Sequence, residues 1–471
     1  MNSIFKVIPG SIVAPRGFLA SGVFCDIKRL GTGKGSEKGR KRDLALIVSE
    51  VPATVAGMFT TNQVCAAPVK VCLERVENGA AQAIVVNSGN ANACTGGQGR
   101  KDAYEMAALT AKALHMPAEH VLVGSTGRIG VTLPMNNVKT GILEAVSLLD
   151  DAPECADHAV EAIMTSDTRP KEMAVEFRLD DKTVRLGGIC KGAGMIQPGM
   201  SVTGRRPAAA PGGAMPGRHA TMLCFITTDA AIQANALQAA LQEAVALSFN
   251  RITVDGDMST NDTVLVLANG LAGNSLLATA NWRSPRGSRK TPKLPPATSS
   301  QRWAAGVFQA ALNHVCLELA KMIVRDGEGV SRFVTVRVNG ARNPAEADAA
   351  ARAVANSALV KTSWNGSDPN WGRIIAALGY SAAKVVEEKV DVGYSAPDRG
   401  KILWSLKHGQ PTRTPFKSLW QTVALKQFDL HINLNLGKAG AVIYAADLTE
   451  QYVEFNKGTI ADPDHPFSLG G

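Results

Sequence analysis

Short apolar runs alternate with amphipathic stretches along most of the chain. Residues 43–50 ("DLALIVSE"), 81–89 and 120–127 are apolar, and turn residues bound each of them, which predicts strands. Residues 102–114 and 154–167 have the pattern of helices. Such alternation of strands and helices indicates an α/β fold, in which helices cover layered sheets, and the length allows two lobes.

The clearest strand pattern lies near the middle of the chain. Residues 182–194 predict a strand that ends in a Gly-rich turn, and residues 221–229 ("TMLCFITTD") are apolar and β-branched from their start. An unbroken apolar run of this length is expected of a strand that is buried on both faces. Apolar residues then recur at every fourth position and predict an amphipathic helix over 230–247. Residues 250–257 return to a strand pattern.

Three segments have the composition of insertions: 31–42, 200–218 and about 278–302. They are rich in Gly, Pro, Ser or basic residues and bury too little apolar surface to order themselves. The formal charge of +9 resides in residues 200–218 and 281–302, which contain nine Lys or Arg and no acid. Because this charge is not a stripe on folded elements, we expect no nucleic-acid partner. Residues 396–425 contain aromatic residues and are predicted to be structured.

The overall composition is that of a folded globular protein, with 45% hydrophobic and 19% charged residues among 471. No apolar run approaches the roughly 20 residues of a membrane span. The N-terminal residues have no pattern of a secretion or transit peptide. The eight cysteines form no C-x-x-C pair. These features predict a cytoplasmic protein with reduced thiols and no membrane partner.

Two stretches have a weak likeness to ligand-binding motifs. A phosphate-binding loop requires Gly-Lys followed by Ser or Thr, but Lys34 is followed by Gly35. Residues 254–262 ("VDGDMSTND") contain three aspartates, but they lack the Gly and Glu that a calcium loop needs. A polar turn whose short side chains bind the backbone is the preferred interpretation. We therefore predict no metal and no cofactor.

Polar residues follow two of the predicted strands. In residues 123–130 ("VGSTGRIG"), the turn offers a hydroxyl and backbone N–H groups at the carboxyl end of a strand, which suits an oxyanion hole. Residues 87–97 ("NSGNANACTGG") form a second polar cluster. Taken alone, residues 123–130 are more often an ordinary tight turn, and residues 87–97 can be either a loop under a ligand or a tight turn.

Thr221 admits a structural and a chemical interpretation. A threonine that opens a strand is most often a simple β-former. If the preceding peptide bond breaks, however, the threonine becomes the first residue of a new chain. Its hydroxyl is then a nucleophile and its own α-amine the base. An α-amine has a pKa of about 8 and is partly neutral near pH 7–8.

Residues 191–198 ("KGAGMIQP") and 220–230 ("ATMLCFITTDA") resemble the two halves of the processing site of ornithine acetyltransferases, also called glutamate N-acetyltransferases. These arginine-biosynthesis enzymes belong to a self-cleaving group with a fold similar to that of N-terminal nucleophile enzymes. Further similar segments occupy nearly the whole chain: 14–23, 85–99, 124–130, 161–171, 249–263, 325–333, 367–374 and 447–456.

The resemblance implies self-cleavage between Ala220 and Thr221, which would give an α chain of residues 1–220 and a β chain of residues 221–471. Thr221 would take the acetyl group of N-acetylornithine and pass it to glutamate in a ping-pong cycle, with acetyl-CoA as a further possible donor. The two chains would stay together as a heterotetramer with two copies of each.

The resemblance also implies roles for single residues. Thr126 and Gly127 would form the oxyanion hole, and the substrate-binding positions fall on Thr165, Lys191, Thr221, Glu328, Asn456 and Ala461. Lys191 can pair with a substrate carboxylate and Glu328 with a cationic nitrogen.

The sequence departs from the family pattern in two places. Residues 200–218 lengthen the link before Thr221 by about eighteen residues. Thr459 and Ala461 stand where the family usually has Tyr and then Thr or Ser. Two alternatives therefore stay open: a self-processing aminopeptidase or amidase of the same fold, in which water accepts the acyl group, and an unprocessed, inactive homologue.

Overall fold

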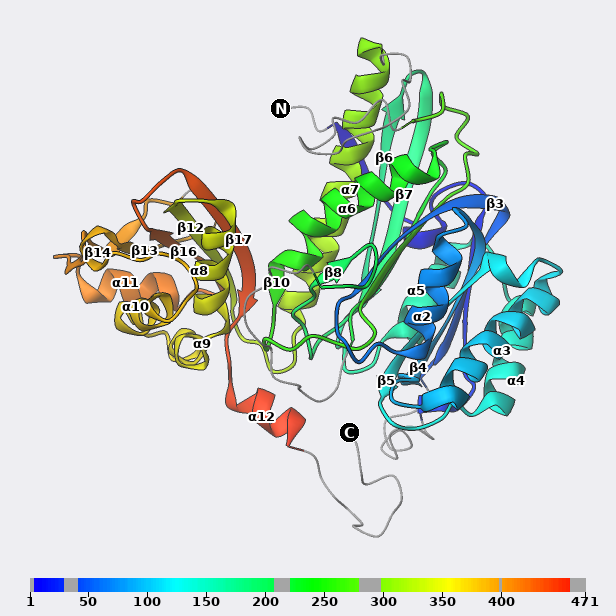
Figure 1. Ribbon diagram of the computed structural model, residues 1–471, viewed down its shortest axis with the longest axis horizontal. Helices are drawn as coiled ribbons and strands as arrows, with labels where there is room; N and C mark the ends of the chain where they lie inside the picture. The colour runs from blue at the N-terminus through cyan, green and yellow to red at the C-terminus, as the bar shows by residue number, and fades with distance from the viewer. Residues whose placement is uncertain (1–3, 29–40, 207–220, 279–297, 398–399, 458–471) are drawn as a thin grey trace, which may run out of the picture.

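A computed structural model describes residues 4–28, 41–206, 221–278, 298–397 and 400–457. The chain forms two lobes (Figure 1). The larger lobe contains the first half of the chain and residues up to the end of a long helix, and the smaller lobe contains most of the remainder. The predicted layered α/β architecture in two lobes is confirmed.

Ten strands of the described residues form the sheet of the larger lobe: β1 (Phe5–Ile8), β2 (Phe18–Val23), β3 (Leu44–Thr60), β4 (Ala80–Asn90), β5 (Val121–Arg128), β6 (Lys171–Leu179), β7 (Lys182–Lys191), β8 (Met200–Ser201), β9 (Leu223–Thr228) and β11 (Thr263–Ala268). Their order is β1-β6-β7-β9-β11-β3-β4-β5, with β2 and β8 also paired to β3. Two apolar cores lie on its two faces.

Helices cover both faces of this sheet. One face carries α2 (Ala67–Val76), α3 (Gly96–Leu114), α4 (Met135–Ser147) and α5 (Pro153–Ile163), and the other carries α6 (Ala234–Leu247) and α7 (Ser299–Arg325). Short 3₁₀ turns are η1 (Ser11–Val13), η2 (Ala118–His120) and η3 (Phe249–Arg251). The result is a sheet between two helical layers (Figure 1).

Strand β9 lies inside this sheet. It pairs antiparallel with β7, where Leu223 faces Lys191, and parallel with β11, where Leu223 faces Thr263. All six of its residues are buried, which confirms the predicted strand with two buried faces. The regular strand begins at Leu223, so Thr221 stands two residues before it, at the edge of the sheet's interior.

Strand β3 is much longer than the predicted strand over 43–50, since it runs from Leu44 to Thr60. Its pairing with β4 shifts register between Val48 and Ala53. Pro52 lies in this interval and has no N–H to donate, so the ladder is interrupted there without ending the strand.

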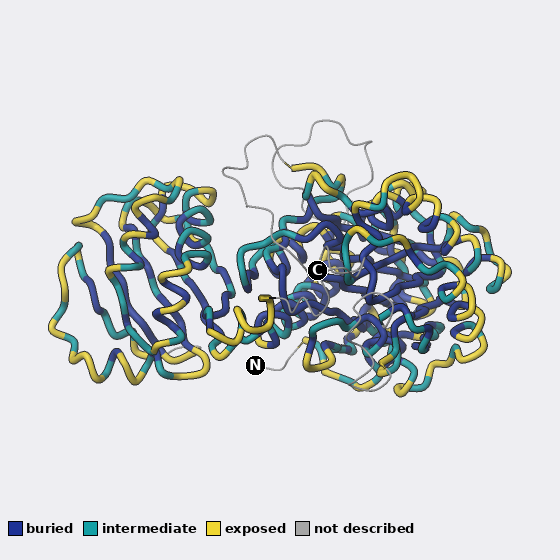
Figure 2. The backbone as a smooth tube through the Cα atoms, turned by 90° about the horizontal axis from the view of Figure 1, so that it is seen from below, coloured by how far each residue is buried: buried dark blue, intermediate teal, exposed yellow. Residues whose placement is uncertain are grey.

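The smaller lobe has its own sheet of seven described strands: β10 (Ile252–Thr253), β12 (Phe333–Ala341), β13 (Asp391–Ser395), β14 (Leu403–Lys407), β15 (Gln410–Pro411), β16 (Gln427–Asn433) and β17 (Ala439–Ala446). Their order is β10-β17-β12-β16-β13-β14-β15. Its remaining elements are α8 (Pro344–Asn356), α9 (Ala358–Asn365), α10 (Trp371–Gly379), α11 (Phe416–Val423) and η5 (Glu387–Lys389). Buried residues gather separately in each lobe (Figure 2). Helix α12 (Glu450–Asn456) extends out of the smaller lobe (Figure 1).

Several predicted boundaries are wrong by a few residues. The helix predicted over 154–167 ends at Ile163, and the helix predicted over 230–247 begins at Ala234. Of the strand predicted over 250–257, only Ile252–Thr253 pairs, because the residues after it form a loop that binds other backbone segments.

Two of the predicted insertions overlap regular elements at the ends that the structure describes. The segment 278–302 ends in the first turn of α7, since Thr298 and Gln301 form a capping box that starts the helix. The segment 200–218 begins with β8, which pairs with β3. Residues 29–40, 207–220 and 279–297 lie outside the described residues. Residues 396–425 contain β14, β15 and α11, as the aromatic content predicted.

Helix α7 is long and apolar enough, by length and composition alone, to cross a membrane. In this structure it packs against β6, β7 and α6, and its side chains Phe308, Leu312 and Leu319 are fully buried in the core of the larger lobe. It is thus placed as a core helix.

Candidate active site

Thr221 is buried where the chain enters β9. Its side chain is 3% exposed, and its Oγ1 lies 2.8 Å from the Oγ of Ser259, which is fully buried. The Ser259 Oγ also accepts the N–H of Asn261 at 3.0 Å. Its own proton is therefore available for Thr221, and either of the two hydroxyls can be the donor in their shared hydrogen bond.

Ser259 belongs to residues 254–262, here called the polar loop. Asp262 in this loop accepts the N–H of Met222 at 3.1 Å, and Asn261 donates from Nδ2 to the carbonyls of Ala91 and Ser125, both at 2.8 Å. The loop thus holds the residues around Thr221 from one side and the ends of β4 and β5 from the other.

The aspartates of the polar loop bind backbone groups in different places. The Asp255 carboxylate accepts the N–H groups of Met195 at 2.6 Å and Ile196 at 2.9 Å, whereas Asp262 faces Met222. Within the described residues, no group of three or more His, Cys, Asp or Glu is placed to hold a metal ion. Asp255 and Asp262 thus bind backbone N–H groups, as polar side chains in turns commonly do.

Lys191 ends β7 and connects two other predicted site residues. Its side chain is fully buried, and its Nζ donates to Thr165 Oγ1 at 2.7 Å and to Thr126 Oγ1 at 3.2 Å. Burial lowers the pKa of Lys191, and the Asp167 carboxylate, 4.0 Å away, acts in the opposite direction. A buried amine with hydroxyl neighbours is suited to binding an oxygen-rich substrate group.

Gly127 has a backbone that only glycine adopts readily. Its φ is +129°, and a Cβ at this position would lie 2.4 Å from the carbonyl carbon of Gly89. Both the dihedral angle and the close approach of β5 to β4 therefore require glycine. The side chain of the preceding residue, Thr126, is fully buried beside Lys191.

Glu328 and Asn456 form a second pair of predicted site residues. The Asn456 Nδ2 donates to Glu328 Oε2 at 3.0 Å, and burial raises the pKa of Glu328. The Glu328 carboxylate lies directly over Gly194, where a Cβ would be 2.4 Å from Oε2. The Glu328 N–H donates to the carbonyl of Ala193 at 2.9 Å. The segment 191–194 therefore connects Glu328 to Lys191.

Helix α12 carries Asn456 to this place. The helix packs on Gly329, whose φ of +67° and missing Cβ allow the backbone of Tyr452 to approach. The Thr449 hydroxyl, at the N-cap of α12, donates to the carbonyl of Gly329 at 2.7 Å. Ala220 and Ala461, the other two predicted site positions, lie outside the described residues.

Sequence reasoning missed a buried charge cluster next to this site. Lys171 forms ion pairs with Asp167 and Asp326, and all three side chains are nearly inaccessible to solvent. Asp326, at the end of α7, also accepts from the Thr168 hydroxyl and N–H. Burial alone would raise the pKa of Asp167, but the two lysines Lys191 and Lys171 hold it below its ordinary value. Residues 161–171 matched the family, but nothing in their spacing indicated a partner in α7.

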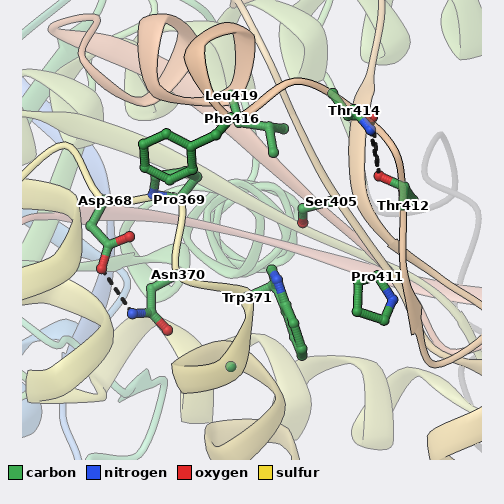
Figure 3. A pocket seen from close by; sticks show the side chains of 11 residues that line it. Asp368, Pro369, Asn370, Trp371, Ser405, Pro411, Thr412, Thr414, Phe416 and Leu419 are labelled. Atoms are coloured by element: carbon green, nitrogen blue, oxygen red, sulfur yellow. Dashed lines mark hydrogen bonds between the residues drawn. The ribbon is translucent and has the colours of Figure 1, made fainter.

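A cavity of about 430 Å³ lies in the smaller lobe, away from these residues. Three segments line it: the turn that starts α10, with Asp368 and Trp371; Ser405 of β14; and the stretch that leads into α11, with Thr412, Thr414 and Phe416 (Figure 3). The Asn370 side chain donates to Asp368 at 2.8 Å across its edge. No candidate site residue that the structure describes lines this cavity.

Comparison with known proteins places the chain in a family. The model of the ArgJ family matches residues 22–458. The arginine biosynthesis bifunctional protein ArgJ of Symbiobacterium thermophilum is 43% identical over 449 residues, which cover 95% of this chain and 98% of that protein. The glutamate N-acetyltransferase of Methanocaldococcus jannaschii is 41% identical over 456 residues, with 96% and 98% covered.

Among solved structures, the ornithine acetyltransferase of Mycobacterium tuberculosis complexed with ornithine is 38% identical, with a TM-score of 0.38 over 42% of this chain and 100% of that chain. The sequence matches decide the assignment. They define an arginine-biosynthesis acyltransferase of the glutamate N-acetyltransferase kind, as predicted. The chain belongs to the ArgJ family.

Proposed function

We propose that this protein cleaves itself between Ala220 and Thr221 and then transfers acetyl groups from N-acetylornithine to glutamate through an acetyl ester on Thr221. The observation that carries this proposal is the buried contact between the hydroxyls of Thr221 and Ser259, 2.8 Å apart. In a chain of the ArgJ family, this contact would hold a hydroxyl nucleophile in a fixed position two residues before Leu223, which pairs with Lys191 at the end of β7.

In the first half of the cycle, the Thr221 Oγ1 attacks the acetyl carbonyl, and the α-amine of Thr221 takes the hydroxyl proton. The carbonyl oxygen becomes an oxyanion, which Thr126 and the N–H of Gly127 stabilise. Lys191 donates to the Thr126 Oγ1, so the Thr126 hydroxyl keeps its own proton to donate to the oxyanion. As the C–N bond breaks, the Thr221 ammonium returns the proton to the α-nitrogen of ornithine, which leaves. Glutamate then enters, and its neutral amine attacks the ester; the Thr221 amine takes a proton from the attacking nitrogen and returns it to Oγ1 as the ester bond breaks.

The two ends of the substrate have opposite charges, and so do the two parts of the site. Lys191, with Thr165 beside it, binds the α-carboxylate, and Glu328 binds the cationic nitrogen of the ornithine side chain. Asn456 holds the Glu328 carboxylate in place. Because both charges are buried, each is worth more to a charged substrate than a surface residue would be.

Cleavage would leave two chains that are interleaved in one sheet. Strands β9 and β11 belong to the second chain, and they lie between β7 and β3 of the first. Asp326 of the second chain also pairs with Lys171 of the first. The two chains therefore remain associated as α and β chains after the cut. We further propose that two such pairs assemble into a heterotetramer.

Mass spectrometry and N-terminal sequencing of the purified protein test the proposal directly. The wild type should contain chains of residues 1–220 and 221–471, the second starting with Thr221. Thr221→Ala should remain one chain and lose acetyl transfer. Thr227→Ala is the matched control, because Thr227 is a buried threonine of the same strand whose hydroxyl binds the carbonyl of Ile12; this variant should still cleave itself and transfer acetyl.

Assays with labelled acetyl donors identify the reaction. Transfer from N-acetylornithine to glutamate should exceed hydrolysis of the donor and of peptides, and an assay with acetyl-CoA determines whether it is a further donor. An intact wild-type chain that transfers acetyl at full rate would contradict the mechanism. Release of free acetate or amino acids without transfer to glutamate would favour the amidase or aminopeptidase alternative.

A further inference from the structure

Asp262 has a buried carboxylate oxygen without a hydrogen-bond partner. Its side chain is fully buried; Oδ1 accepts the Met222 N–H at 3.1 Å, while Oδ2 has no partner among the described residues. A buried polar atom that makes no hydrogen bond costs about 1–3 kcal/mol. Such atoms are rare in folded proteins, and each calls for a physical explanation.

The position of Asp262 suggests what its free oxygen binds. The residue directly precedes β11, beside the entrance to β9, and its Oδ1 holds the backbone N–H of the residue that follows Thr221. The backbone nitrogen of Thr221 is therefore one residue away from the group that Oδ1 holds. The same polar loop brings Ser259 to the Thr221 hydroxyl. One loop thus contacts the Thr221 hydroxyl and the N–H of the next residue.

We propose that Asp262 Oδ2 accepts a hydrogen bond from the α-amine that self-cleavage creates on Thr221 and thereby orients this amine toward Oγ1. The inference rests on the proposed role of Thr221. Before cleavage, the nitrogen of Thr221 is a planar amide with a single proton. After cleavage it is an amine, and in its neutral form one of its two N–H groups can satisfy Oδ2 while its lone pair faces the hydroxyl. Asp262 acts as a positioning residue.

The charged groups around Asp262 determine how this pair titrates. Burial raises the pKa of Asp262 to about 8; the nearby backbone N–H groups of Met222 and Ser259 and the charge of Lys191 on β7 lower it, and Asp255 in the polar loop raises it. From β3, Thr60 contributes only its N–H, which donates to the Asp262 backbone carbonyl at 2.8 Å. With the α-amine next to it, an ionised Asp262 favours the ammonium form. The Asp262 carboxylate therefore raises the pKa of the Thr221 α-amine, which becomes neutral at a higher pH than it would without Asp262.

Asp262→Asn tests the proposal in the full-length, self-cleaved enzyme. The amide oxygen can still accept the Met222 N–H, but an amide NH₂ in place of Oδ2 cannot accept from the amine. We expect two chains as in the wild type, a KM within about 2-fold and a kcat lower by roughly 10-fold or more. The acid limb of the kcat–pH profile should move to lower pH, because the α-amine titrates without a neighbouring anion.

Asp229→Asn is the matched control. Asp229 is fully buried at the other end of β9, burial raises its pKa, and it accepts the N–H of Arg185 at 2.8 Å. Like Asp262 it is buried and accepts a backbone N–H, but its second oxygen lies 3.6 Å from Arg16, and it lies a whole strand away from Thr221. This variant should keep the wild-type acid limb and kcat.

The outcomes separate this inference from the proposed function. A cleaved Asp262→Asn enzyme with the wild-type acid limb overturns the role of Asp262 and leaves that of Thr221 intact. If the variant does not fold or does not cleave itself, a crystal structure of the cleaved wild type decides: the distance from Oδ2 to the Thr221 nitrogen should be below about 3.2 Å, and more than about 4 Å overturns the proposal. A wild type without Thr221 at a new N-terminus contradicts the proposed function itself.

Discussion

Thr221 and Ser259 are 38 residues apart in the sequence, and their side-chain oxygens lie 2.8 Å apart in the interior of the larger lobe. One hydroxyl enters from the start of β9 and the other from the polar loop before β11. The two strands are parallel neighbours, so the pairing of the sheet itself brings the hydroxyls together. In the proposed mechanism, Ser259 would therefore orient the Thr221 hydroxyl.

Ser259→Ala should therefore slow acetyl transfer without weakening substrate binding. The alanine removes the hydrogen bond that fixes the Thr221 hydroxyl, and misplacement of a reacting group by about 1 Å can cost roughly 100-fold in rate. We expect kcat to fall by about 10- to 100-fold and KM to change by less than about 2-fold. Steady-state kinetics of acetyl transfer by the purified, cleaved variant measure both.

Ser21→Ala is the control for this variant, because Ser21 is equally buried and its hydroxyl donates to the carbonyl of Ala145 at 2.8 Å, far from Thr221. Its loss should lower stability by about 1 kcal/mol and leave kcat unchanged. An unchanged kcat in Ser259→Ala would show that the Thr221 hydroxyl needs no partner.

Gly127→Ala should abolish most activity while the chain still folds. The new Cβ would lie 2.4 Å from the carbonyl carbon of Gly89, so the end of β5 must move away from β4. The predicted oxyanion donors move with it, and loss of one such donor typically costs about 100- to 1,000-fold in kcat. Kinetics together with circular dichroism distinguish this effect from unfolding.

Gly130→Ala is a control that distinguishes the steric clash of a new Cβ from the strain of a positive φ. Gly130 also has a positive φ, +88°, but nothing lies within 4 Å of the position of its Cβ. Its replacement should cost about 1–2 kcal/mol of backbone strain and should leave most of the activity. Similar losses of activity in the two variants would contradict a specific role of Gly127.

The sequence was most informative for elements that are buried on all sides. Residues 221–229 predicted a strand buried on both faces, and β9 has this character because apolar, β-branched runs fit only the inside of a sheet. The pattern did not predict the length of β3, since Pro52 in its middle resembled a break. Nor did it predict that α7 begins inside a polar segment, because a capping box needs only two polar side chains.

The sequence also indicated some residues of the candidate site and missed others. The resemblance indicated Thr126, Thr165 and Lys191, and the structure brings these three side chains into contact. Ser259 and Asp262 lie in a stretch whose composition indicated only a polar turn. Composition shows that short polar side chains bind backbone groups, but only the pairing of β9 with β11 shows which backbone and which threonine they face.

Lys361 gives a prediction about stability and pH. The side chain is buried on α9, and its Nζ donates to the carbonyl of Ala446. Burial lowers its pKa to about 8, although Asp255 and Asp447 act in the opposite direction. An unfolded chain keeps the lysine proton up to about pH 10.4. Between about pH 8 and pH 10, the unfolded state therefore binds more protons, and the contribution of Lys361 to stability rises with pH.

Lys361→Met removes this titration. The free energy of unfolding of the wild type minus that of the variant should be constant from pH 6 to about 7.5 and should then increase toward pH 10. Denaturant unfolding at a series of pH values measures this difference, and the constant range at low pH serves as an internal control. A difference that stays constant up to pH 10 would show that the lysine remains charged in the folded protein.

Asp326→Ala should destabilise the cleaved protein far more than the loss of an exposed charge. Asp326 pairs with buried Lys171 and accepts from Thr168, and removal of one partner from a buried ion pair costs about 3–5 kcal/mol. Glu318→Ala is the control on the same helix, because Glu318 pairs with Lys321 where both side chains are partly accessible to solvent, and such an i,i+3 pair is worth about 0.5 kcal/mol or less. Denaturant unfolding measures the stability of both variants.

Equal unfolding midpoints of the two variants would mean that the buried cluster adds nothing to the association of the two chains. A lower midpoint for Asp326→Ala, with the chains separating on gel filtration, would identify the cluster as a link between them.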